Sequence, residues 1–161
     1  MSHDARSAAA RREAITSQIE AETGIDEAMI ERLIRSFYAR VREDAILGPI
    51  FDAKIKDWEP HLQRMFAFWS SVALMSGRYR GQPMARHLPL PIDAQHFDRW
   101  LALFAQTARA TCPRGAAERF ILLSRRIAES LELGVASARG VILRKGERFS
   151  YGKPRTTAGK P

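Results

Sequence analysis

The sequence has few of the features that mark secreted, membrane-spanning or repetitive proteins. Only one cysteine, Cys112, occurs in 161 residues, so an internal disulfide is excluded. No apolar run approaches the roughly 20 residues that a membrane span needs, and the first residues lack the charged-then-apolar pattern of a signal peptide. No internal repeat is visible. These absences lead us to expect a soluble, cytoplasmic protein with no membrane partner.

The net charge of +8 is distributed unevenly along the chain. Residues 137–161 hold seven basic residues against one glutamate, so they carry most of that charge. The body therefore has an ordinary charge balance, and we do not expect a nucleic-acid partner. With 45% hydrophobic residues the chain suits one globular domain. We predict an N-terminal extension over 1–22, a globular domain over 23–136 and a basic tail over 137–161.

The tail from about Arg139 onward is rich in Gly, Ser, Thr, Lys, Arg and Pro. Such a composition has too little apolar content to pack, so the tail is predicted to be disordered and dispensable. Its ordinary interpretation is a solubilising extension, and the alternative is weak contact with acidic surfaces.

The spacing of apolar residues predicts an all-α protein with no strand. Amphipathic stripes recur every three or four residues, which is typical of helices, over about 26–43, about 58–76, after the candidate N-cap Asp93, and from near Gly115. Gly48-Pro49 ends the first of these. Three prolines between Gly77 and Pro91 leave room for only a short helical turn around His87. Residues 1–22 are compatible with one more, frayed helix.

Aromatic and histidine residues occupy fixed places on these patterns, and their order resembles the truncated haemoglobins, in particular the third group. No single motif is decisive, but the order and spacing are specific over about residues 23–136. The absence of the paired glycines found in the first and second groups agrees with this. The matching segments are Phe37-Tyr38, Leu47-Gly48-Pro49-Ile50-Phe51, His61 with Phe68-Trp69, Gly81-Gln82-Pro83-Met84, His87-Leu88-Pro89-Leu90-Pro91 and Phe97-Asp98-Arg99-Trp100-Leu101 with Phe104.

The resemblance implies a truncated globin-like fold, a two-over-two helical sandwich around haem b. It assigns His87 as the proximal ligand of the iron, since a neutral imidazole on a short turn suits that role. Taken alone, a histidine beside prolines is more often a loop residue bonded to a backbone carbonyl. His96 is a competing ligand. We prefer His87 because His96 falls in the first turn of a helix, where exposure is expected.

Tyr38, His61 and Trp100 match the family's distal positions on its B, E and G helices. Bound oxygen carries partial negative charge, so phenol and indole donors in a dry pocket can hold it. Tyr38 and Trp100 also lie on apolar stripes, and each alone would be interpreted as a core aromatic. His61 has two further interpretations: an exposed first-turn residue, or a gate that points out of the pocket.

The remaining lining follows from the same resemblance. Phe51 matches the globin phenylalanine that packs on the porphyrin, and Met65 and Phe68 follow His61 by four and seven residues, on the same helix face. Arginines suit the haem propionates because guanidinium binds carboxylates in pairs of hydrogen bonds. Four are available, Arg64, Arg78, Arg80 and Arg86, and we select Arg64 and Arg86.

The sequence thus predicts a haem protein that binds O2, NO and CO at ferrous iron. One hypothesis is oxygen or nitric oxide chemistry, resembling that of an NO dioxygenase or a peroxidase, which needs a reductase as partner. A second is a haem-based ligand sensor or carrier without turnover. A third is a basic helical interaction module without haem, and the aromatic and histidine residues on converging faces argue against it.

Overall fold

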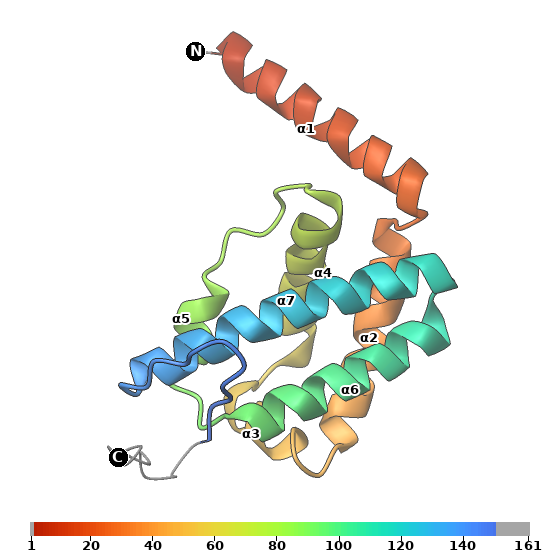
Figure 1. Ribbon diagram of the computed structural model, residues 1–161. Coiled ribbons are helices and arrows are strands. Elements are labelled where there is room, and N and C mark those ends of the chain that lie inside the picture. The colour runs from red at the N-terminus through yellow and green to blue at the C-terminus, as the bar shows by residue number, and fades with distance from the viewer. Residues whose placement is uncertain (1, 151–161) are drawn as a thin grey trace.

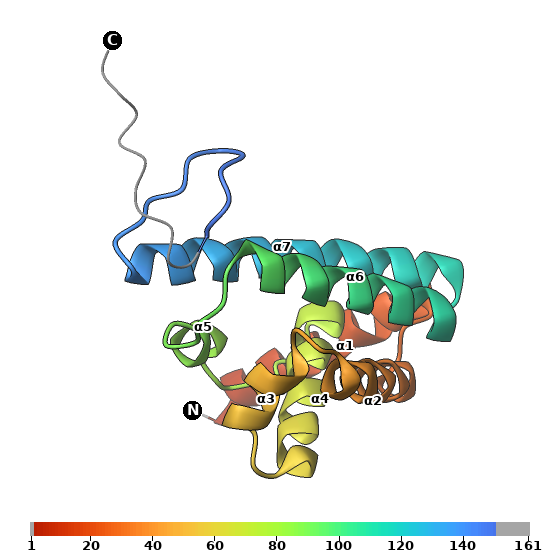
Figure 2. The same ribbon diagram turned by 90° about the horizontal axis from the view of Figure 1, so that it is seen from below.

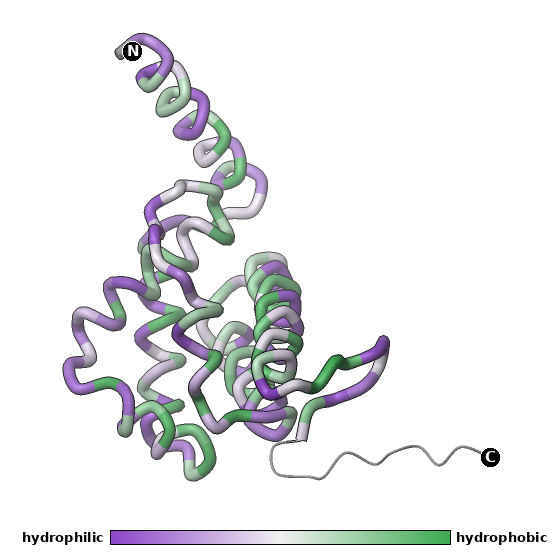
Figure 3. The backbone as a smooth tube through the Cα atoms, turned by 90° about the vertical axis from the view of Figure 1, so that its left-hand side faces the viewer, coloured by the Kyte–Doolittle hydropathy of each residue, from purple (hydrophilic) through white to green (hydrophobic). Residues whose placement is uncertain are grey.

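Seven helices and no strand form within residues 2–150, the part of the chain that this computed structural model describes. The four long helices predicted from apolar spacing are present as α2 (Glu27–Glu43), α4 (Trp58–Leu74), α6 (Ala94–Thr111) and α7 (Arg114–Ala138). Hydrophobic and hydrophilic residues alternate along them in Figure 3, as amphipathic helices require. No helix in the described range combines the length and hydropathy of a membrane span.

Two aspartates fix where the helices around the site begin. The Asp26 carboxylate accepts a hydrogen bond from the backbone N–H of Met29, at 2.8 Å, and caps α2. Asp93 caps α6 by accepting from the backbone N–H of Gln95, at 3.0 Å, while the His96 ring accepts the backbone N–H of Asp93. These caps satisfy N–H groups that the first helical turn leaves free. The predicted cap at Asp93 is confirmed.

Two short helices lie between the long ones. α3 (Gly48–Lys54) was not predicted, because Gly48-Pro49 was interpreted only as the end of the preceding helix. Proline is tolerated in a first turn, so the dipeptide begins α3, whereas α2 already ends at Glu43 with Asp44 as its C-cap. The Gly48 Cα lies so close to the backbone oxygen of Arg42 that a Cβ there would be 2.8 Å from it. α5 (Pro83–His87) is the predicted short turn, bounded by prolines.

The helices form two layers. In Figure 2, α6 and α7 lie side by side above α2, α3 and α4, with α5 at one end. Between the layers the Trp69 ring stacks on Phe104, with centroids 4.8 Å apart, and meets Phe120 edge-on. All three side chains are almost completely buried. This is the predicted two-over-two helical sandwich.

At the N-terminal end the further helix with which residues 1–22 are compatible is present, whereas the C-terminal tail differs from the prediction. α1 (Ser2–Thr23) is a long helix that extends away from the body (Figure 1) and is tied to it by a hydrogen bond from Thr16 Oγ1 to the Leu74 carbonyl. The basic tail was expected to remain unpacked from about Arg139 onward. Instead residues 139–149 fold back onto α6 and α7, and Phe149 is 4% exposed. Its apolar ring supplies the burial that composition alone did not reveal. Residues 151–161 lie outside the described range.

Candidate functional site

A cavity of about 820 Å³ lies where α2, α3, α4, α5, α6 and α7 meet. Its size falls within the range of ligand pockets, about 300–1,000 Å³. Most of its lining is apolar, with a few polar side chains. The structure brings all nine predicted site residues to this one cavity: Tyr38, Phe51, His61, Arg64, Met65, Phe68, Arg86, His87 and Trp100.

His87 is the last residue of α5, and the contact of one ring nitrogen fixes the state of the other. Its Nδ1 lies 2.6 Å from the carbonyl oxygen of Pro83. A carbonyl can only accept, so Nδ1 must carry the proton and donate. In the neutral ring Nε2 then keeps its lone pair, which is the state that a metal ligand requires.

His96, the competing ligand, is engaged by the cap of α6. Its Nδ1 lies 3.0 Å from the backbone nitrogen of Asp93, which donates, and 3.2 Å from Asp93 Oδ1, which can only accept. Our reason for setting His96 aside was wrong: its side chain is only 21% exposed and it lines the cavity. The two histidines differ in that the carbonyl partner of His87 fixes the tautomer of that ring, whereas the two contacts of His96 do not.

Tyr38 projects from α2 into a cluster of aromatic side chains. Its ring lies edge-on to Phe37, Phe51 and His61, with centroid distances of 5.0, 5.7 and 5.2 Å. Tyr38 is buried, and this burial raises the pKa of its hydroxyl. The hydroxyl therefore stays protonated at neutral pH and can donate. Within residues 2–150 no side chain or backbone group accepts a hydrogen bond from it.

His61 lies in the first turn of α4 and is half-buried, which contradicts an exposed first-turn position. Its ring meets Tyr38 and Trp58 edge-on. Burial, with the positive charge of Arg64 adding to it, lowers the pKa of His61 to about 4, so the ring is neutral at pH 7. Its Nε2 is shielded from solvent and has no hydrogen-bond partner in the described structure. An unsatisfied buried nitrogen beside a cavity indicates a missing ligand.

Trp100 reaches the cavity from α6. Its indole stacks on Phe104, with centroids 5.4 Å apart and planes at 10°, and meets Phe37 edge-on. These contacts fix the plane of the indole. Trp100 therefore both packs on the core and lines the cavity, so the two interpretations of this residue are compatible.

Flat side chains form another part of the wall. Phe51 of α3 stacks on Trp58, with centroids 6.3 Å apart and planes at 25°. The Arg42 guanidinium covers the Trp58 ring at 4.7 Å. Met65 and Phe68 follow on α4, and Phe68 meets Tyr79 edge-on at 5.3 Å. Of these residues, Phe51, Met65, Phe68 and Tyr79 line the cavity and give it a largely apolar slot.

The arginines around the cavity are not equivalent. Arg78 forms an ion pair with Glu27, in which Nη1 and Oε2 are 2.8 Å apart. Arg64, Arg80 and Arg86 also line the cavity, and none of them forms an ion pair with a carboxylate in residues 2–150. Arg64 and Arg86, the two that we selected, are thus available to an anionic ligand.

These features fit the haem that the resemblance implies. A porphyrin needs an apolar slot, a nitrogen ligand with a free lone pair, and cations for its two carboxylates. The cavity has the slot, the tautomer of His87 has the lone pair, and Arg64 and Arg86 supply the charge.

Sequence reasoning missed the contact that seats α5 against α7. Gly134 lies inside α7, where a Cβ would be 2.2 Å from the Met84 sulfur. The glycine therefore lets Met84, three residues before His87, lie directly against the helix. The available signal was a glycine in a helix interior, which costs about 0.5–1 kcal/mol relative to alanine and so needs a reason.

The chain is similar to known globins in both sequence and structure. Residues 21–124 match the family model described as bacterial-like globin. The group 3 truncated haemoglobin ctb of Campylobacter jejuni is 38% identical over 88 residues, which cover 52% of this chain and 69% of that protein. The group 2 truncated haemoglobin YjbI of Bacillus subtilis is 30% identical over 80 residues, covering 48% of this chain and 61% of that one.

Solved structures give the same result. The group III truncated haemoglobin from Campylobacter jejuni superposes with a TM-score of 0.62 and 32% identity, covering 66% of this chain and 88% of that one. The group II truncated haemoglobin from Bacillus anthracis gives a TM-score of 0.60 at 25% identity, covering 80% and 95%.

Proposed function

Because the chain belongs to the bacterial-like globins, as a truncated haemoglobin of the third group that binds diatomic ligands at haem iron, we propose how its own residues divide that work. His87 is the proximal ligand of haem b. Tyr38, His61 and Trp100 contact the gas on the distal side, and Arg64 and Arg86 bind the propionates. We further propose O2 and NO as the physiological ligands.

The observation that carries this proposal is the proton state of the cavity's polar groups. His87 presents a lone pair, since Nδ1 is occupied by the Pro83 carbonyl. Tyr38 presents a protonated hydroxyl because burial raises its pKa. His61 is neutral, so it brings no positive charge toward the iron. One metal-ligating nitrogen and a set of neutral hydrogen-bonding groups therefore line a single, largely apolar cavity.

When bound, haem supplies a ferrous iron that takes up diatomic gases and exchanges electrons with them. Around it the chain excludes water through Phe51, Met65 and Phe68, and keeps hydrogen-bond donors oriented before the ligand arrives. Preoriented donors stabilise developing negative charge without the cost of reorganising solvent. Tyr38 and Trp100 have the geometry for this, because aromatic contacts fix both rings.

We propose oxidation of nitric oxide as the leading activity. The reaction NO + O2 + e⁻ → NO3⁻ consumes one electron per turnover, so it requires a reductase as partner. A donor set that retains oxygen favours this chemistry, since oxygen must stay bound until nitric oxide arrives. A sensor or carrier without turnover is the second candidate, favoured by the same retention if no reductase engages the protein.

Two measurements test the proposal. The purified protein is expected to show a Soret band that shifts on reduction and again with carbon monoxide. The oxygenated protein is then mixed with nitric oxide, with and without NADH and a flavin reductase, and nitrate is measured per haem. Nitrate that accumulates beyond one equivalent only with the reductase supports turnover. Release of unreacted oxygen without nitrate identifies the carrier, and a chain without a Soret band contradicts the whole proposal.

A further inference from the structure

The chain after α7 folds back over the end of the cavity that carries His87. We call residues 139–149 the C-terminal strap. Phe149 is 4% exposed and packs in a cluster with five other buried residues: Ile92, Phe97, Ala128, Val135 and Ala136. Ile92, Phe97 and Ala128 also line the cavity. The strap therefore packs on the outer side of the same wall that encloses the ligand.

Backbone hydrogen bonds join the strap to the start of α6. The Phe149 carbonyl accepts from the backbone N–H of Ala94, at 2.8 Å, and the Phe149 N–H donates to Glu132 Oε1, at 3.3 Å. Ala94 is the first residue of α6, so its N–H has no partner inside the helix. The strap supplies that partner from more than fifty residues away in sequence.

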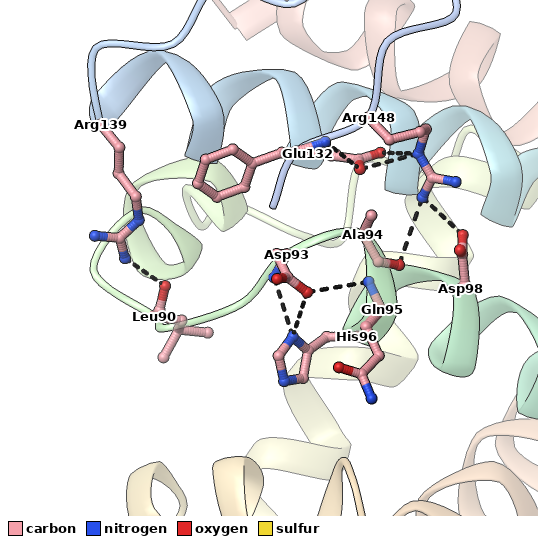
Figure 4. Close-up of polar contacts among 10 residues, drawn as sticks. Leu90, Asp93, Ala94, Gln95, His96, Asp98, Glu132, Arg139 and Arg148 are labelled. Carbon is pink, nitrogen blue, oxygen red and sulfur yellow. Dashed lines mark hydrogen bonds and ion pairs between the residues drawn. The ribbon is translucent and has the colours of Figure 1, made fainter. Parts of the chain in front are cut away.

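Arg148 joins three segments at once, as Figure 4 shows. Its Nε donates to both carboxylate oxygens of Glu132 on α7, at 3.0 and 3.1 Å, and its Nη2 donates to Asp98 on α6, at 2.7 Å. Glu132 is 9% exposed at the side chain. Burying a carboxylate without a partner is costly, and the ion pair with Arg148 offsets this cost for Glu132.

The other end of the strap reaches the residues that directly follow His87. Arg139 Nη2 donates to the Leu90 carbonyl, at 2.7 Å, and the Leu90 N–H donates to the His87 carbonyl, at 3.0 Å. Two hydrogen bonds in series thus connect the strap to the backbone of His87 (Figure 4 shows the first). The segment from Leu88 to Asp93 is held at both of its ends.

We propose that the C-terminal strap positions the proximal histidine, with Arg148 and Phe149 as its positioning residues. The proposal rests on the proposed role of His87 as iron ligand. α5 has only five residues, and a helix of one turn is too short to hold its own orientation. The orientation of His87 is instead set by its attachments: Met84 against Gly134 on one side, and the strap through Leu90 and Ala94 on the other.

The test uses the full chain with haem bound and the variant Arg148→Gln. Two quantities are measured: the rate of haem transfer to excess apomyoglobin, and the iron–histidine stretching band of the ferrous protein by resonance Raman. We expect haem transfer to be about tenfold faster, the size of effect that the loss of one charged hydrogen bond produces. We also expect the iron–histidine band to broaden or shift, because His87 is held less firmly.

Matched variants separate positioning from general stability. Arg148→Lys keeps a donor to Glu132 and should recover part of both signals. Lys145→Gln removes an exposed cation from the same strap and should change neither. If Arg148→Gln does not fold, Asp98→Asn removes one charged partner of Arg148 and is a milder change. It should shift the haem-transfer rate and the iron–histidine band in the same direction by a smaller amount.

The outcomes are distinguishable. An Arg148→Gln protein that unfolds more easily, but keeps the parent haem-transfer rate and iron–histidine band, would show that the strap only stabilises the fold, and the proposal would be overturned. Loss of the native iron–histidine band in His96→Gly but not in His87→Gly would instead overturn the proposed function. That result says nothing about the contacts of Arg148.

Discussion

The Nδ1 of His87 lies 2.6 Å from the carbonyl oxygen of Pro83, one helical turn earlier in the chain. This contact decides the chemistry of the ring, because it places the proton on Nδ1 and leaves the Nε2 lone pair free. It also unites two interpretations that the sequence left opposed. One ring can satisfy both, because His87 bonds to the backbone carbonyl through Nδ1 and leaves Nε2 for the proposed bond to iron.

Removing the Tyr38 hydroxyl or the Trp100 indole is expected to speed oxygen release. Loss of one hydrogen bond of roughly 1 kcal/mol should raise the dissociation rate about fivefold. Tyr38→Phe and Trp100→Phe retain most of the packing, and the double variant should be non-additive because both donors address one ligand. Stopped-flow dissociation measures this. Rates within about twofold of the parent in all variants would mean that Tyr38 and Trp100 are only core aromatics.

Acid should destabilise the protein partly through Asp44. Hydrogen bonds from Arg99, Leu47 and Ile46 hold the pKa of this carboxylate below its usual value, the contact with Arg99 contributing most. The stabilisation is therefore complete above the unfolded-state pKa of about 3.8 and is lost as the pH falls through the folded-state pKa, because the unfolded chain binds the proton first.

We expect Asp44→Asn to lower the free energy of unfolding by roughly 1 kcal/mol at neutral pH. The difference from the parent should shrink as the pH falls below about 3.8, because the parent then loses the same interaction on protonation. Denaturant unfolding followed by far-UV circular dichroism measures both effects. Asp52→Asn, an exposed aspartate on α3, is the control. A pH-independent difference would mean that the Asp44 charge is not responsible.

Gly134→Ala should weaken haem retention although alanine favours a helix by about 0.5–1 kcal/mol. The added Cβ would overlap the Met84 sulfur, so the end of the Met84 side chain must leave its place against α7, and α5 loses this contact. Gly115→Ala meets no atom within 4 Å and should simply stabilise α7. The double variant Gly134→Ala with Met84→Ala should regain retention because the space is restored. Equal haem-transfer rates for Gly134→Ala and Gly115→Ala would refute the role of this contact.

Much of the fold was predictable because local signals agree with it. The apolar spacing of α2 and the caps at Asp26 and Asp93 act within a few residues, so the sequence displays them directly. α3 was missed because Gly48-Pro49 was interpreted as a helix stop, whereas it forms the first turn of α3 and α2 ends earlier, at Glu43.

The sequence predicts which residues line the site but not the protonation state or partners of their polar atoms. The resemblance named residues that share one cavity, from Tyr38 on α2 to His87 on α5. The state of each polar atom depends on partners that periodicity cannot reveal, such as the Pro83 carbonyl that fixes the tautomer of His87. The packing of the tail was hidden for the same reason: Arg148 looks like one more basic tail residue until Glu132 and Asp98 are known to lie beside it.

The central claim is that His87 is the proximal ligand, and exchange of the ligand tests it most directly. Ferrous His87→Gly and His96→Gly are compared by resonance Raman with and without added imidazole. We predict that His87→Gly loses the iron–histidine band and that imidazole restores an iron–imidazole band by filling the vacated position, while His96→Gly keeps the parent band. Loss of the band in His96→Gly, with the parent band intact in His87→Gly, would contradict this account.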